Sequence, residues 1–200
     1  MTERNVYIEP EERRVIRTKD VYQTAAEIGR TGYSDKLCSV VADFKNNGAP
    51  EGYNAQCMVG KSKRGEVAMW LYGVVDPDSD RFLKVGFKAR GCLAMTACSS
   101  MIAQMIEGKS FEEALAIQGE DLKAELDGVP QEKSYAVIIA IEGVKALVGD
   151  YLVRQGASLE TLDAALPCDP MSLPCLATEH CSLRDSRVEL RLAQMKGDPS

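Results

Sequence analysis

The first half of the chain changes from a helical to an extended hydrophobic pattern. Apolar residues recur at helical spacing behind Ser34, which can cap a helix, and they are Leu37, Val40, Val41 and Phe44. An earlier helix is predicted over residues 20–28, where Asp20 is an acceptable N-cap. A loop rich in Asn, Gly and Pro, residues 46–50, ends this helical part.

Three stretches that are rich in valine and aromatic residues follow this loop. They span residues 55–59, 66–75 and 81–88, and short turn-like segments at 60–65 and 76–80 separate them. Strands joined by such short turns are typical of an antiparallel meander.

The second half of the chain returns to the helical period. A methionine- and isoleucine-rich stripe runs from Met95 to Ile106, and Gly108 ends it. Ser110 and Glu113 form a capping box for a short helix, because each can bond the other's free amide. Further helices are predicted over residues 121–126, 133–154, 158–166 and 184–195.

The predicted fold class is therefore α+β, a three-stranded antiparallel meander packed against several helices on one face, with N- and C-terminal extensions. We divide the chain into a charged N-terminal arm (1–19), a central domain (20–156) and a cysteine-containing C-terminal extension (157–200).

Composition narrows the function classes. The 200 residues include 30 acidic and 24 basic side chains, which gives a formal net charge of −6. This charge argues against a nucleic-acid partner, and the chain has no apolar run of membrane-spanning length. No signal-peptide pattern is present at the beginning, so we expect a cytoplasmic protein.

Cysteine is the unusual component, since the chain holds seven cysteines beside a single histidine, His180. An odd number cannot all pair within one chain, and in a reducing compartment thiols stay free, bind metal or carry sulfur. One histidine makes histidine-based acid–base catalysis hard to assemble. The cysteines are Cys38, Cys57, Cys92, Cys98, Cys168, Cys175 and Cys181.

Several specific sequence blocks follow one another in order: FKARGC at 87–92, ACSS at 97–100, EGKS at 107–110 and VPQEK at 129–133. Within a match over residues 30–155, this ordered set resembles the IscU/NifU-type scaffolds of iron–sulfur cluster assembly. The resemblance implies a site of three cysteines and one aspartate for a cluster or zinc. It also implies a cysteine desulfurase, a recipient iron–sulfur protein and an Hsp70-type chaperone as partners, the chaperone through the loop of Val129 and Pro130.

The chain departs from the family's ligand pattern at two of the three cysteines. Cys92 retains the second cysteine, whereas Arg64 stands in the place of the first and Ala136 in that of the third. Glu66 takes the place of the aspartate.

Other cysteines could replace the missing ligands. Cys57 lies on a strand near the family site, and Cys181 lies in a His-Cys-Ser block like the one absent around Ala136; that identity could also be coincidence. A separate tail site would use Cys168, Cys175, His180 and Cys181, although their spacing matches no standard zinc or cluster pattern. Cys38 and Cys98 fit core packing better than ligation, and Cys57 could serve either purpose.

Two main functions remain open from the sequence, beside a third possibility in which zinc bound by the tail has a structural role on an inert domain. The favoured hypothesis is a scaffold or sulfur carrier, rather than an enzyme, that receives sulfur from a cysteine desulfurase and holds an iron–sulfur cluster, or zinc, with an altered ligand set. The alternative is a metal-free binding module that acts on another assembly protein or client enzyme.

Overall fold

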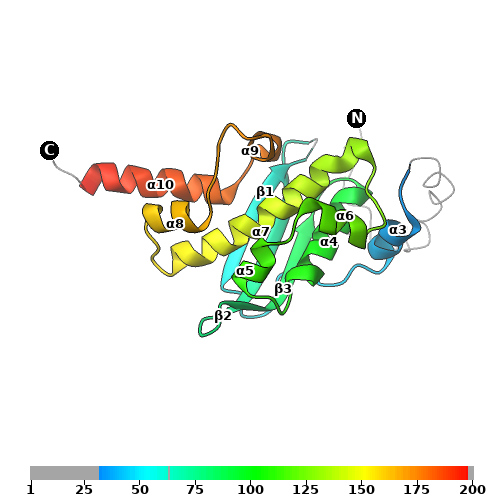
Figure 1. The fold of residues 1–200 in the computed structure, drawn as a ribbon, viewed down its shortest axis with the longest axis horizontal. Helices are drawn as coiled ribbons and strands as arrows, with labels where there is room; N and C mark the ends of the chain where they lie inside the picture. The colour runs from blue at the N-terminus through cyan, green and yellow to red at the C-terminus, as the bar shows by residue number, and fades with distance from the viewer. Residues whose placement is uncertain (1–31, 63, 198–200) are drawn as a thin grey trace, which may run out of the picture.

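The computed structural model describes residues 32–62 and 64–197, and in that part three strands lie beside a set of helices (Figure 1). The predicted helix at residues 20–28 and the N-terminal arm fall outside the described residues.

The strands form one antiparallel sheet in the order β1-β2-β3, which confirms the predicted meander. Cys57 pairs with Leu71, and Leu71 pairs with Phe87, so one row of side chains crosses all the strands on the same face. The bounds are Ala55–Lys61 for β1, Val67–Asp76 for β2 and Arg81–Ala89 for β3.

The helices begin at caps that the sequence indicates. The Ser34 hydroxyl accepts a hydrogen bond of 3.0 Å from the amide of Leu37, and Ser110 and Glu113 form the predicted capping box. In this domain the helices are α3 (Asp35–Ala42), α4 (Leu93–Ile106), α5 (Phe111–Leu115), α6 (Gly119–Glu125), the short 3₁₀ helix η2 (Gln131–Lys133) and α7 (Ser134–Arg154). The first of them ends before Phe44, whose ring instead packs edge-on against Phe87.

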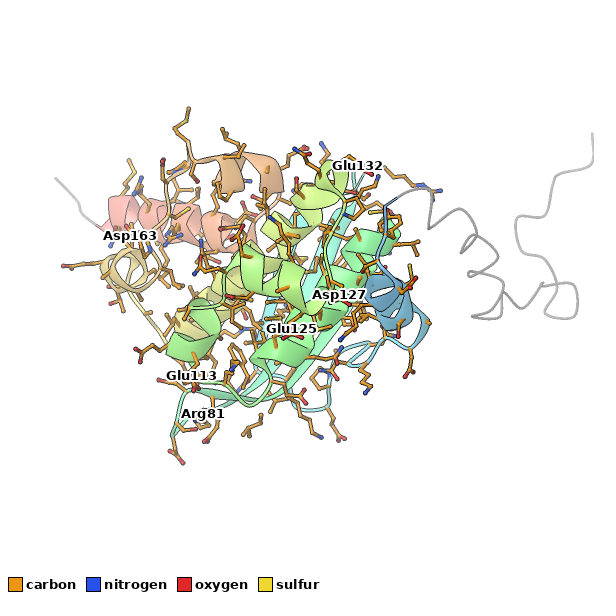
Figure 2. All side chains as sticks on the ribbon, turned by 45° about the vertical axis from the view of Figure 1, so that its right-hand side comes forward. Arg81, Glu113, Glu125, Asp127, Glu132 and Asp163 are labelled. Atoms are coloured by element: carbon orange, nitrogen blue, oxygen red, sulfur yellow. The ribbon has the colours of Figure 1, made fainter. Side chains whose placement is uncertain are left out.

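The long helix α7 and helix α4 pack against the same face of the sheet, and α7 runs diagonally across it (Figure 1). The core between the helices and the sheet is apolar, and its residues Leu71, Phe82 and Leu147 are all fully buried. At the far end of the sheet Arg81 reaches Glu113 with an ion pair of 3.2 Å, which links the start of β3 to α5 (Figure 2).

The C-terminal extension folds back along the free edge of β1. The amide of Gly60 donates to the carbonyl of His180 at 2.8 Å, and the amide of Met58 donates to the Ser182 hydroxyl at 3.2 Å. Between these bonds Cys181 forms an isolated antiparallel bridge with Val59. The extension thus covers an edge that would otherwise present unpaired backbone groups.

The extension contains α8 (Leu159–Ala165), α9 (Leu173–Thr178) and α10 (Ser182–Gly197). The hydrophobic pattern did not predict α9, which Ser172 caps by accepting a hydrogen bond from the Cys175 amide, with a proline in its first turn. Helix α10 extends by about half a turn beyond each end of its predicted range.

Among the described residues, none of the helices has both the length and the apolar composition that crossing a membrane requires.

Candidate functional site

A pocket of about 970 Å³ lies where the β1–β2 loop, the end of β3 and the beginnings of α4 and α7 meet. Cys92 lies in it at the N-cap of α4, Tyr135 comes from the first turn of α7, and Glu179 comes from the C-terminal extension. Figure 2 shows Glu132, just before α7, at the end of the molecule opposite Arg81, which places this pocket away from the β2–β3 turn. The sheet, both central helices and the extension therefore all contribute to one site.

The Cys92 thiol is half-buried and lies near two tyrosines. Its Sγ shares a hydrogen bond of 3.1 Å with the Tyr135 hydroxyl, and Tyr33 lies near enough for Cys92 to affect its pKa. Burial, with the neighbouring Cys92, raises the pKa of Tyr33 to about 12 and raises the pKa of Tyr135 as well. Both phenols therefore stay protonated near neutral pH and can donate to a sulfur anion.

The N-terminus of α4 lies beside the same sulfur and favours negative charge there. Cys92 has an extended conformation and its side chain makes no capping hydrogen bond, so the first amides of α4, which follow Cys92 directly, have no acceptor from the N-cap side chain. Such amides carry partial positive charge and stabilise a thiolate.

The two charged residues expected near this thiol also line the pocket. Arg64 and Glu66 come from the β1–β2 loop, and both are exposed. The Glu66 carboxylate forms an ion pair of 2.6 Å with Arg90 rather than with Arg64. Ala136, which the sequence pattern predicts in the place of the family's third cysteine, is fully buried, and its methyl group has no donor atom to offer the pocket.

Cys57 and Cys98 point into the core rather than into the pocket. The Cys57 thiol is 1% exposed and donates to the Gly143 carbonyl on α7 at 3.2 Å. Cys98 is fully buried within α4, and Cys38 is also buried, which agrees with the packing role expected for these two residues. Burial raises the pKa of the Cys57 thiol and raises that of Cys98 to about 12.

We expect Cys57 and Cys98 to resist alkylation in the folded protein at about pH 8, because only the thiolate reacts and both thiols stay protonated and shielded there. Native iodoacetamide labelling followed by peptide mass spectrometry should show at least about hundredfold slower modification of both than of exposed Cys168. Denaturant should abolish the difference. Because a raised thiol pKa stabilises the folded state below the ordinary thiol pKa, this contribution should be lost as the pH rises from about 9 towards 12. Labelling of Cys98 at the rate of Cys168 would contradict the packing role.

The three tail cysteines lie in the C-terminal extension. Cys175 and Cys181 are buried and Cys168 is exposed, and burial, together with the neighbouring Cys175, raises the pKa of Cys168. Burial raises the pKa of Cys181, while His180 is exposed. Cys181 thus approaches the buried side of β1 near Cys57 and does not line the pocket of Cys92.

The donors in the described residues do not fit a standard cluster or zinc site. Such sites need about four donors, and the pocket offers the Cys92 thiol and the carboxylates of Glu66 and Glu179, which are already paired with Arg90 and Lys61. Within residues 32–62 and 64–197 no group of three or more His, Cys, Asp or Glu side chains is arranged to hold a metal ion. The altered ligand set, through Cys57, the tail cysteines or His180, stays a prediction.

Several pocket residues were not identified from the sequence as parts of the site. Tyr135 directly precedes Ala136 in the sequence, but its bond to Cys92 follows from its place in the first turn of α7. No local sequence pattern indicates Lys133 or Glu179, because they reach the pocket from η2 and from the end of α9 only when the chain is folded. In the loop expected to meet a chaperone, Val129 is half-buried and Pro130 is buried.

Comparison with known proteins gives a consistent result. Residues 32–158 match the model of the NifU-like N-terminal domain family. The chain is 34% identical over 129 residues to the nitrogen fixation protein NifU of Azotobacter chroococcum, a match that covers 64% of this chain and 40% of that protein. It is 34% identical over 127 residues to the iron–sulfur cluster assembly scaffold protein IscU of Haemophilus influenzae, which covers 62% of this chain and 98% of that one. A solved structure of a NifU-like protein (N-terminal) from Brucella abortus overlaps 68% of this chain and 90% of its own, with 18% identity and a TM-score of 0.36.

Proposed function

The chain belongs to the family of NifU-like N-terminal domains, and from this premise we propose that it serves iron–sulfur cluster assembly as a scaffold-type sulfur carrier. In this proposal Cys92 receives sulfur from a cysteine desulfurase, and a recipient iron–sulfur protein is the eventual destination of that sulfur.

The observation that carries the proposal is the environment of Cys92. Its thiol is half-buried in an open pocket, beside the amides of α4 and the Tyr135 hydroxyl, whereas Cys38, Cys57 and Cys98 are buried in the core. A nucleophilic sulfur has to be both reachable and stabilised as an anion. Of the thiols in the domain, Cys92 is the one that lines this pocket, and it lies beside a hydroxyl that can donate to a sulfur anion.

The sulfur transfer is a displacement at sulfur. The Cys92 thiolate attacks the outer sulfur of a persulfide, R–S–S–H, on the desulfurase; the S–S bond of that persulfide breaks, and the thiolate R–S⁻ leaves. Cys92 then carries the persulfide Cys92–S–S–H, so sulfur, proton and charge are all accounted for. The protonated hydroxyls of Tyr33 and Tyr135 can donate to the sulfur anion before and after transfer.

No step of this proposal passes through a metal. A cluster would be cargo on such a scaffold, and Cys92 with Glu66 and Glu179 falls short of the donors that a cluster or zinc needs. A larger ligand set would have to come from a second chain or from a rearranged tail.

Loading with sulfur tests the proposal. Incubating the protein with a cysteine desulfurase and L-cysteine should add the mass of one sulfur atom to the peptide that contains Cys92, because this thiol is reachable and activated. The variant Cys92→Ser should lose this modification, and its overall sulfur loading should fall at least about tenfold.

Cys168→Ser is the matched control, since it removes an exposed thiol outside the pocket. It should load as the unchanged protein does. Loading of Cys168 with none on Cys92 would overturn the proposal.

The second candidate function is a metal-free module that binds another assembly protein or client enzyme. What supports it is the sequence pattern, which predicts Arg64 and Ala136 in the places of two of the family's cysteines, in a chain that matches the family model over residues 32–158. A stoichiometric complex with the desulfurase that forms equally with Cys92→Ser, and without persulfide on either protein, would favour this function.

A further inference from the structure

The pocket around Cys92 carries an excess of positive charge. Four basic side chains line it, and two of them are neutralised there: Lys61 pairs with Glu179 at 3.0 Å and Arg90 pairs with Glu66 at 2.6 Å. The other two, Arg64 and Lys133, form no ion pair with any acidic side chain in the part of the chain that the structure describes. This local excess contrasts with the formal net charge of −6 for the whole protein.

The amides at the beginning of α4 reinforce that charge. They lie next to Cys92, whose own side chain does not cap them, and a helix N-terminus favours an anion. A guanidinium such as Arg64 binds a planar carboxylate with two parallel hydrogen bonds, whereas it repels a metal cation. The polar groups of the pocket therefore select for negative charge.

The size and the lining of the pocket indicate that its ligand is larger than a simple ion. Its volume of about 970 Å³ is at the upper end of the range for small-molecule sites. Met95, Ile139 and Ala177 supply apolar wall between the charged groups and can cover the carbon skeleton of a ligand. The half-buried Cys92 thiol is the reactive group on this wall.

We propose that the pocket is a binding site for small carboxylate-bearing thiols, which react in their disulfide form with Cys92. Arg64 and Lys133 hold the carboxylates, and the ligand's sulfur lies against the Cys92 sulfur. The Cys92 thiolate attacks one sulfur of the disulfide R–S–S–R, the S–S bond breaks, and the mixed disulfide Cys92–S–S–R forms as R–S⁻ leaves. This proposal uses the thiol of the proposed function but needs no desulfurase.

The charge preference of Cys92 can be measured with two aromatic disulfides, the dianionic dithiobis-nitrobenzoate and the neutral dithiodipyridine. The quantity of interest is the ratio of their rates at Cys92, because a change in the thiolate fraction affects both reagents alike and cancels. Peptide mass spectrometry assigns each mixed disulfide to its cysteine, which separates Cys92 from the exposed Cys168.

We expect Arg64→Ser and Lys133→Ser each to lower the ratio of anionic to neutral rates by about fivefold, since each removes a charge close to the reacting sulfur. Lys84→Ser is the matched control, because it removes an exposed charge on β3 outside this pocket, and it should leave the ratio within about twofold. In the unchanged protein the ratio should fall as salt is added.

Three results would overturn the proposal. The first is an equal loss for both reagents in Arg64→Ser and Lys133→Ser, and the second is a loss in Lys84→Ser as large as theirs. The third is a ratio in the unchanged protein that salt does not alter, a measurement that needs no variant to fold. Each of these leaves sulfur loading by a desulfurase untouched, so failure here and failure of the proposed function can be told apart.

Discussion

Replacing Phe82 with alanine should lower the free energy of unfolding by about 3–5 kcal/mol, because it leaves a cavity at the centre of the core. The Phe82 ring is fully buried and packs against Phe111 with 5.2 Å between ring centroids, and Phe111 packs in turn against Tyr151 at 5.4 Å. One substitution therefore weakens the contact of β3 with both α5 and α7. Urea denaturation monitored by circular dichroism measures the change.

Leu83→Ala is the control for this substitution, since it removes a neighbouring apolar side chain that is 57% exposed. Its effect should stay within about 0.5 kcal/mol. Similar losses in both variants would show that the two faces of β3 are not divided into core and solvent as described.

Gly86→Ala should cost about 3 kcal/mol, although it adds only a methyl group. A Cβ at this position would lie 2.0 Å from the Gly48 carbonyl oxygen and 2.8 Å from Pro50 Cδ. The loop of residues 46–50 would have to move away from β3, where the Gly48 amide donates to the Phe87 carbonyl at 2.7 Å and the Phe87 amide donates to the Asn46 carbonyl at 2.9 Å. Denaturation again gives the free energy, and amide hydrogen exchange at Phe87 reports the lost contact.

Gly108→Ala separates the effect of steric crowding from that of a backbone conformation that favours glycine. Gly108 has a φ of +80°, and a Cβ added there would meet no other atom within 4 Å. The substitution should therefore cost only the left-handed conformation, about 1 kcal/mol. A larger loss at Gly108 than at Gly86 would contradict the role given to the loop contact.

Local sequence patterns predicted most of the fold. The strands are predictable because stretches rich in valine and aromatic residues lie between short turns. The caps at Ser34 and Ser110 are predictable because serine side chains can accept hydrogen bonds from the free amides of a helix N-terminus. The sequence did not predict helix α9, because it lies among prolines and cysteines and is too short to show a hydrophobic period. Phe44 continues the helical spacing, yet its packing against Phe87 holds it outside the helix.

The site was predictable where it depends on neighbours in sequence. Cys92 follows a glycine between a strand and a helix, and this local arrangement singled it out together with the family pattern that also indicated Arg64 and Glu66. Tyr33 and Lys133 reach the same region only through the packing of α3 and α7 around α4, and no local pattern encodes that. The His-Cys-Ser block makes Cys181 a candidate ligand, but no local pattern in the sequence indicates that this part of the tail contacts β1.

The strip of tail along β1 has a consequence for how copies of this protein behave towards one another. Without the backbone of His180 and the hydroxyl of Ser182, the amides of Gly60 and Met58 would stand open on a strand of largely buried, apolar residues. Such an open strand is a template on which a second chain can add its own. The extension therefore protects this edge of the sheet from pairing with a strand of a second copy, and we expect it to oppose association of the protein in concentrated solution.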